Sequence, residues 1–329
     1  MGFGLKKILK KLIIYSLPFL ILFGMFVAFE PYDYFGMRNG KSDYLCKPLS
    51  SVRELLLNHP ENIVLGDSRM ANLNMELAES FAGEPYTMLG FGGAQTGELI
   101  ELFWYATEHT ELKKVIFGVN LYTTIDEQGP GRIPSVIEQA EDPAKFILHA
   151  GHWLGAINAL KTSILNAVWS ATGHPERMEF PEDPTDYSRA QDIPAEMGEK
   201  YRLNLEEYCK LLRSNMGISP EVRQETVDKL KEVVEYCDAN GIEIIFVYPP
   251  IHISVYEMYE DMDVLKEAEK YKSYLRSVAK VYDFEFPNSF TENDDNFYDG
   301  FHLPNTVKPY LVELIFTDLE ADCVRRTEP

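Results

Sequence analysis

Short apolar runs alternate with longer segments of helical periodicity through most of the chain after residue 60. The apolar runs, which predict strands, cover residues 62–66, 86–89, 115–119, 242–248 and 282–286. Segments with apolar residues three or four positions apart predict helices at 52–58, 70–80, 98–108, 220–240, 264–281 and 305–319. Strands that alternate with helices are typical of an α/β fold, in which helices cover both faces of a mostly parallel sheet. Functional loops of such sheets follow the carboxyl ends of the strands.

This alternation stops between residues 122 and 219. Within that stretch, residues 146–169 are mostly apolar and predict a helix, and residues 175–194 are rich in Pro, Asp and Glu and predict a loop. We interpret residues 122–219 as an insertion into the α/β domain that serves as a lid or a substrate platform. The aromatic and histidine residues of 146–169 could form a binding face, but packing of the helix against the core explains them more simply.

The first thirty residues have the pattern of a membrane anchor. An apolar run at 12–29, long enough to span a hydrocarbon core as a helix, follows Lys6, Lys7, Lys10 and Lys11. A cleaved signal peptide is the alternative, but residues 26–31 offer no small-x-small cleavage site. Lysines before the run place the N-terminus in the cytoplasm and the remainder outside the membrane. The predicted organisation is a cytoplasmic tip at 1–11, a transmembrane anchor at 12–29 that contacts the lipid bilayer, a linker or docking segment at 30–60 and an α/β domain at 61–329.

Charge and cysteine content restrict the partners of the outer part. The formal net charge is −21, and the first thirty residues carry four lysines and one glutamate, which leaves −24 on the rest. So acidic a surface argues against a nucleic-acid partner. The four cysteines, which lack the CxxC spacing of a zinc site, are Cys46, Cys209, Cys237 and Cys323. They either form disulfides, for which three pairings exist, or remain as buried thiols. The sequence predicts no metal and no cofactor.

Two short motifs supply residues for nucleophilic catalysis. Ser68 follows the apolar run at 62–66, where a helix is about to begin, and Asp299 and His302 lie three residues apart near the other end of the chain. Together these side chains would provide a nucleophile, the acid that orients the base, and the general base. The structural alternatives are that Asp67 and Ser68 only cap the following helix and that Asp299 and His302 belong to a surface turn.

Four sequence blocks in this order resemble the SGNH (GDSL-type) hydrolase superfamily. The blocks are Gly66-Asp67-Ser68, Gly93, Asn120 and Asp299-x-x-His302. The resemblance spans about residues 62–120 and 221–320 and leaves the insertion unmatched. It implies a three-layer α/β/α, flavodoxin-like fold with Ser68, Asp299 and His302 as catalytic residues.

The same resemblance implies an oxyanion hole. Its donors would be the backbone N–H groups of Ser68 and Gly93 and the side-chain amide of Asn120, which would bind the negative oxygen of a tetrahedral intermediate. The blocks depart from the usual family pattern at two positions. Leu121 stands where the third block usually has Asp, and Met88 stands where the second block often has Asn. Neither position carries a catalytic role, but both argue against a standard soluble esterase.

An anchor, a Gly-Asp-Ser-Arg block and a central insertion together resemble the cell-envelope acyltransferases of the superfamily, which include teichoic-acid D-alanyl transfer and alginate-acetylation proteins. The resemblance implies transfer or removal of O-linked acetyl or D-alanyl groups on a cell-envelope glycopolymer or a lipid-linked acceptor, beside a membrane-bound O-acyltransferase. Two alternatives remain open. One is a lipase, thioesterase or deacetylase with the same triad, and the other is a non-catalytic scaffold that binds glycan or assists envelope assembly.

Overall fold

The computed structural model describes the chain except for residues 1, 38–46, 126–130, 173–204, 218–221 and 318. The chain divides into two compact units. One unit combines residues 1–45 with residues 137–179, and the other combines residues 46–136 with residues 180–329. Each unit is described by itself, and the predicted loop at 175–194 lies outside the described residues.

The second unit is built on a six-stranded sheet in the order β2-β1-β3-β4-β5-β6. The first five strands pair in parallel, in the 2-1-3-4-5 order of a flavodoxin-like sheet, and β6 pairs antiparallel with β5 at the edge. The strands are β1 (Asn62–Leu65), β2 (Thr87–Met88), β3 (Lys114–Gly118), β4 (Glu243–Tyr248), β5 (Lys280–Asp283) and β6 (Arg325–Thr327). The predicted α/β class with a mostly parallel sheet is confirmed.

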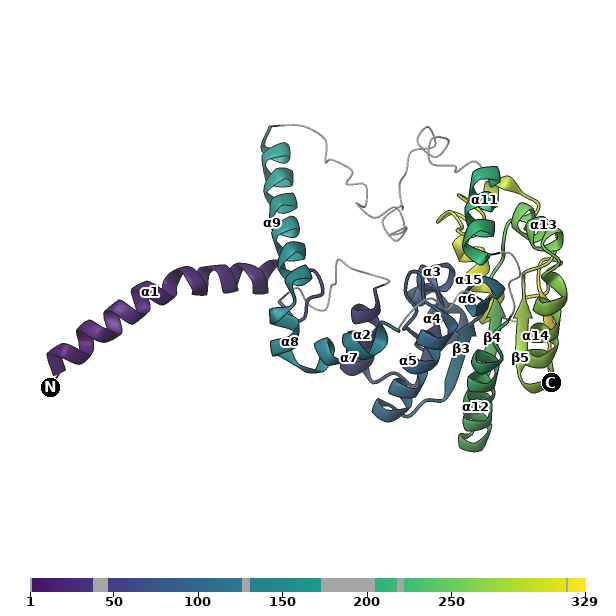
Figure 1. Ribbon diagram of the computed structural model, residues 1–329, viewed down its shortest axis with the longest axis horizontal. Helices are drawn as coiled ribbons and strands as arrows, with labels where there is room; N and C mark the ends of the chain where they lie inside the picture. The colour runs from purple at the N-terminus through teal and green to yellow at the C-terminus, as the bar shows by residue number, and fades with distance from the viewer. Residues whose placement is uncertain (1, 38–46, 126–130, 173–204, 218–221, 318) are drawn as a thin grey trace. The chain divides into compact units, whose positions relative to one another are not determined.

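Helices cover both faces of this sheet (Figure 1). On one face, α4 (Met75–Ala82) and α15 (Lys308–Phe316) share a buried cluster with alternate strand residues such as Val64, Ile116 and Val247. The opposite face is covered by α2 (Pro48–Asn58), α5 (Thr96–His109) and α12 (Gln224–Asn240), which pack against one another and the sheet. The central strands are buried on both faces, as a parallel sheet requires: all four residues of β1, the last four of β3 and the last four of β4 are buried. Helix α14 (Leu265–Val278) packs along β5.

Several elements differ from the predictions. The predicted helix at 70–80 is two helices, α3 (Ser68–Ala71) and α4, because the Asn74 side chain accepts a hydrogen bond from the Leu77 N–H and starts a new helix there. The short helix α13 (Ile253–Asp261) and the edge strand β6 were not predicted, since neither has a long periodic pattern. The remaining elements are α6 (Leu121–Ile125), α7 (Ile133–Glu141), α11 (Leu205–Met216) and the 3₁₀ helix η2 (Asp294–Asn296).

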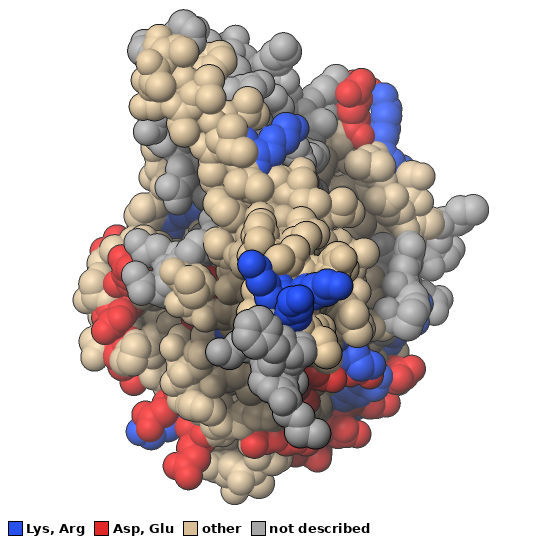
Figure 2. All heavy atoms as spheres, turned by 90° about the vertical axis from the view of Figure 1, so that its left-hand side faces the viewer, with Lys and Arg blue, Asp and Glu red and all other residues tan. Residues whose placement is uncertain are grey.

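The first unit contains α1 (Gly2–Phe29), α8 (Pro143–Leu148) and α9 (Ala150–Ala171). Among the described residues, only the segment Lys10–Phe29 of α1 is long and apolar enough to cross a membrane. The described lysines at the tip of α1 are exposed, and Figure 2 shows blue side chains where this tip points toward the viewer. The helix predicted at 146–169 is divided at His149 into α8 and α9. Helix α9 packs on α1 near its beginning, whereas its residues 163–171 are exposed, so packing against a core does not account for the whole helix.

Candidate active site

The end of β1 is shaped to present Ser68. A side chain at Gly66 would lie 2.6 Å from the Met70 Cβ, so only glycine lets the chain turn so closely under the next helix. Asp67 is the N-cap of α3, and its Oδ1 accepts a hydrogen bond from the Arg69 N–H at 3.0 Å. Ser68 is therefore the first residue of a helix, where backbone N–H groups have no partner within the helix.

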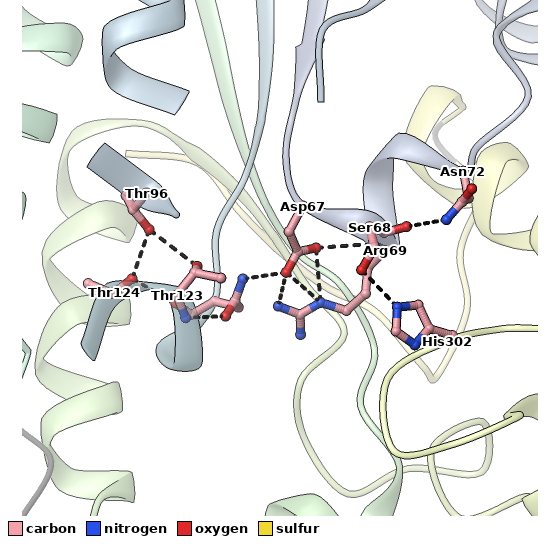
Figure 3. Close-up of polar contacts among 9 residues, drawn as sticks. Asp67, Ser68, Arg69, Asn72, Thr96, Thr123, Thr124 and His302 are labelled. Atoms are coloured by element: carbon pink, nitrogen blue, oxygen red, sulfur yellow. Dashed lines mark hydrogen bonds and ion pairs between the residues drawn. The ribbon is translucent and has the colours of Figure 1, made fainter. Parts of the chain in front are cut away.

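Ser68, His302 and Asp299 lie in hydrogen-bond contact (the Ser68–His302 bond is drawn in Figure 3). Ser68 Oγ is 2.7 Å from His302 Nε2, and His302 Nδ1 is 2.8 Å from Asp299 Oδ2. With the imidazole proton assigned to Nδ1, the ring donates to Asp299 and accepts the Ser68 hydroxyl proton. This arrangement joins residues 234 positions apart in the chain.

The Asp299 carboxylate is fixed by its own loop. Its Oδ1 accepts hydrogen bonds from the N–H groups of Phe301 at 2.7 Å and His302 at 2.8 Å. Burial alone would raise the pKa of this carboxyl, but His302 and the two N–H groups outweigh burial and hold the pKa below its usual value. Asp299 is thus an ionised, immobile partner for the imidazole.

A buried ion pair supports the nucleophile block from behind. Arg69 Nη2 donates to Asp67 Oδ2 at 2.7 Å, and Arg69 Nε contacts both carboxylate oxygens at 3.2 Å (Figure 3). The Arg69 guanidinium also lies 4.6 Å from the centre of the Phe301 ring, next to His302 in the chain. Burial opposes ionisation of Asp67, but Arg69 more than offsets burial and lowers the pKa of the Asp67 carboxyl. Arg69 therefore contacts both segments that carry the triad.

Asn120 is buried directly behind the nucleophile block. Its Nδ2 donates to Asp67 Oδ2 at 3.1 Å, and its Oδ1 accepts from the Thr123 N–H at 2.8 Å. The second contact makes Asn120 the cap of α6. An amide nitrogen carries two hydrogens, so the bond to Asp67 uses one of them.

Gly93 occupies a turn that requires glycine, with φ at +63°. An ionic clamp holds this turn in place. Arg132 Nη2 donates to the Gly93 carbonyl oxygen at 2.7 Å, while the same guanidinium binds Glu98 through Nη2 at 2.6 Å and Nε at 2.7 Å. Glu98 in turn accepts the Gln95 N–H at the start of α5. The conformation of the Gly93 turn is thus coupled to the beginning of a long helix.

A narrow pocket opens beside Ser68 and His302. Its wall is largely apolar, with Pro249, Leu303 and Leu311 among the lining residues. The charged side chains that line it, among the described residues, are Arg69 and Lys308, and no carboxylate does. The pocket therefore combines an apolar wall with positive charge next to the candidate nucleophile.

The structure brings together the three predicted catalytic residues and places Gly93 and Asn120 on loops that follow neighbouring strands. Three contributors were missed by the sequence analysis, namely Arg69, Arg132 and Lys308. Arg69 follows the nucleophile and gave no sign of burial, Arg132 lies far from the motifs that it supports, and Lys308 follows His302 closely but belongs to no recognisable motif. Only the Glu98 position, three residues after Gln95 at the start of a predicted helix, carried a recognisable capping signal.

The similarity found between this chain and known proteins is structural and distant. No protein-family profile matches the sequence, and no curated protein matches it. Among solved structures, a crystal structure from Bacteroides fragilis NCTC 9343, described as a "putative acylhydrolase", shares 10% sequence identity. The match covers 80% of this chain and 93% of that chain, with a TM-score of 0.38. Similarity this low says nothing about the activity of this chain.

Proposed function

We propose that the chain is an SGNH-type serine enzyme that transfers or hydrolyses acyl groups. The observation that supports this proposal most is the continuous chain of hydrogen bonds from Asp299 through His302 to the Ser68 hydroxyl, at 2.8 and 2.7 Å. A non-catalytic scaffold has no need for this alignment and would tolerate Ser68 and His302 beyond hydrogen-bond reach. Because a serine hydroxyl is a weak nucleophile, a base at this distance is the feature that activates it.

The proposed reaction proceeds through an acyl-serine. His302 Nε2 removes the Ser68 hydroxyl proton as Oγ attacks the acyl carbonyl carbon, and Asp299 stabilises the imidazolium that forms. The imidazolium then protonates the departing alkoxide oxygen or thiolate sulfur as the original ester or thioester bond breaks, which leaves Ser68 acylated. In the second half, His302 takes a proton from water or from an acceptor hydroxyl, whose oxygen attacks the acyl-serine carbonyl carbon. The bond between the acyl carbon and Oγ breaks, the imidazolium returns its proton to Oγ, and the free acid or the acylated acceptor leaves.

The oxyanion would be bound by the N–H groups of Ser68 and Gly93 and by the Asn120 side-chain amide. Ser68 contributes an N–H at a helix start, and Arg132 holds the turn that carries Gly93. Asn120 is held by Asp67 and by its cap on α6. Preorganised donors of this kind each contribute about 10²- to 10³-fold to the rate in serine hydrolases.

The proposed location is the outer face of a cell membrane, with α1 as a single-pass anchor and the N-terminus in the cytoplasm. Lysines before the span and none directly after it support this orientation. The acceptor would be a cell-envelope glycopolymer, such as a teichoic acid, or a lipid-linked acceptor, acylated with acetyl or D-alanyl groups. A membrane-bound O-acyltransferase would be the partner that delivers acyl groups across the membrane.

Positive charge in the pocket supports an anionic substrate. The part of the chain after residue 30 carries −24, which repels an anionic polymer, yet the pocket beside Ser68 is lined by Lys308 and Arg69 and by no described carboxylate. Lys308 lines this pocket together with Ser68 and His302, and its half-buried ammonium donates to Asn305 Oδ1 at 2.7 Å. Because it places a positive charge in the pocket wall, Lys308 is the residue we expect to bind an anionic group of the substrate.

Replacing Lys308 with methionine should weaken selection for anionic substrates. We expect kcat/KM for an ester that carries a phosphate or carboxylate to fall about tenfold, through KM, because a partly desolvated charge pair is lost. The neutral ester of the same shape should be hydrolysed as before. Lys308→Arg should keep the preference, and Lys231→Met, at a lysine that does not line the pocket, should change neither substrate. Equal loss on both esters in Lys308→Met would contradict a role in charge selection.

A substrate screen tests the proposed function and separates its two main forms. The full-length protein in detergent is incubated with short-chain acetyl and D-alanyl esters and thioesters, with and without a glycopolymer acceptor, and free acid and acylated acceptor are quantified. A transferase should acylate the acceptor at the expense of hydrolysis, while a lipase, thioesterase or deacetylase should release free acid at the same rate in both conditions. No turnover of any ester or thioester, with triad residues intact, would count against both.

A further inference from the structure

Helix α9 has one apolar face that is exposed to solvent within its unit. The large apolar side chains on this face are 48–62% exposed at Leu154, Ile157, Ile164 and Val168. They recur at intervals of three, four or seven positions, which places them on one side of an α-helix. The opposite side carries small polar residues, among them Ser163 and Asn166. An exposed apolar side of this extent indicates a surface that contacts another protein or a membrane.

Charge distinguishes α9 from the rest of the chain. The chain has 52 acidic residues, but the 22 residues of α9 include none, and Lys161 is its one charged residue. Lys161 lies within the apolar side, where a long stem can bury itself while the ammonium reaches water. Trp169 extends the apolar side near the end of the helix. A helix with no carboxylate, a lysine and a terminal tryptophan has the composition of a segment at a lipid surface.

The beginning of α9 is fixed to the end of the candidate membrane span. The Trp153 ring stacks on the Phe26 ring with centroids 4.3 Å apart, and Phe26 also lies 5.9 Å from the Phe146 ring. Phe26 belongs to the last turn of the apolar segment Lys10–Phe29. His152 and Ala156 are buried in the same contact. The first turns of α9 therefore sit at the level where α1 would leave the membrane.

The direction of α9 relative to α1 also fits a membrane surface. Helices α1 and α9 belong to the same unit, and α9 runs across the axis of α1 rather than along it (Figure 1). A helix that starts at the end of a membrane span and runs across its axis lies parallel to the membrane plane. We propose that α9 is an interfacial helix, whose apolar side enters the boundary between the headgroups and acyl chains of the outer leaflet. This inference goes beyond the proposed enzyme activity, and it rests on α1 spanning the membrane.

A lipid surface fits these observations better than a protein partner. A protein partner could cover an apolar face wherever that face lies. A bilayer can cover it only if the face begins at the membrane boundary, and the Trp153–Phe26 contact places the beginning of α9 at the end of the candidate span. Helix α9 is also too polar to be a second span, since its polar side includes Ser163, Asn166 and Ser170. The predicted lid or platform role of this part of the insertion is then replaced, for α9, by attachment to the membrane.

The test measures the environment of the two sides of α9 in the full-length protein. The four native cysteines are changed to serine, and a single cysteine carrying an environment-sensitive fluorophore is placed at Ile164 or Val168, or at the matched polar positions Ser163 or Asn166. The proteins are reconstituted in nanodiscs of phosphatidylethanolamine and phosphatidylglycerol, with and without nitroxide-labelled lipid. We expect quenching by the labelled lipid to be at least threefold stronger at the apolar positions than at the polar ones. A label at Leu20 in α1 reports separately whether α1 spans the bilayer.

The outcomes are distinct. Strong lipid quenching at Leu20 with equal, water-like emission on both sides of α9 would overturn the interfacial helix and leave the anchor intact. Labels at 164 and 168 that are protected from both lipid and aqueous quenchers would also overturn it, because another surface of the protein would then cover this side. A second check needs no fluorophore and leaves the four native cysteines unchanged. Quenching of tryptophan fluorescence by brominated lipid should decrease when Trp169 is replaced with phenylalanine, and unchanged quenching would contradict the proposal. Lack of esterase activity has no bearing on any of these readings.

Discussion

Replacing Ser68 with alanine is expected to reduce acyl turnover by roughly 10⁴- to 10⁶-fold, which is the largest effect we predict. The reason is that Ser68 Oγ is the atom in hydrogen-bond contact with His302 Nε2, and alanine leaves the base without a nucleophile to activate. The measurement is the rate of ester hydrolysis or transfer, together with labelling by a fluorophosphonate that reacts with activated serines. Both should be lost together.

The matched control is Ser80→Ala. Ser80 lies in α4, the next helix of the same block, and is exposed, with its hydroxyl bonded to the Leu77 carbonyl oxygen. Turnover and labelling should therefore be unchanged. Circular dichroism should show that Ser68→Ala is folded, since the substitution removes a single hydroxyl at a helix start. A Ser68→Ala protein that still reacts with the probe or still turns over the best ester would disprove the assignment of the nucleophile.

Much of the site could be predicted because three of the four blocks follow a strand of a parallel sheet. Strands β1 and β3 have short apolar runs that are easy to recognise, and the carboxyl ends of such strands meet at one edge. Ser68 and Asn120 follow these strands directly, so proximity came from topology rather than from local pattern. Asp299 and His302 follow no strand directly, and their placement came from spacing and resemblance.

The supporting interactions could not be predicted, because they join residues without a common pattern. Arg69 looks like an ordinary charged residue in the first turn of a helix, and its burial depends on Asp67 and Phe301 both being in reach. Arg132 reaches Gly93 and Glu98 from a segment that the sequence analysis assigned to the insertion. The exposure of the apolar side of α9 could not be predicted either, because an apolar helix that packs in a core and one that lies on a lipid surface share the same periodicity.

The largest effect on stability is expected from Arg69→Met. The Arg69 and Asp67 side chains are 3% and 10% exposed, and the guanidinium contacts the carboxylate through Nε and Nη2. Methionine fills a similar volume but leaves the Asp67 carboxylate buried without its counter-ion. Breaking a buried pair from one side typically costs about 3–5 kcal/mol. We expect a loss of that size in the opening free energy of β1 and α3, measured by hydrogen exchange on the full-length protein in detergent.

The double variant Asp67→Asn/Arg69→Met shows whether the lost charge pair is the cause. An asparagine at 67 can still cap α3 and accept from Asn120, but it carries no charge to leave uncompensated. The double variant should therefore be more stable than Arg69→Met alone by at least about 1 kcal/mol, which is within the range of coupling energies between residues in direct contact. Lys210→Met, which breaks an exposed pair with Glu206 in α11, should leave the exchange of β1 unchanged. If the double variant is as unstable as the sum of the two single variants, then Arg69 stabilises the block by packing on Phe301 instead, and the Asp67–Arg69 charge pair contributes nothing to holding Ser68 in place.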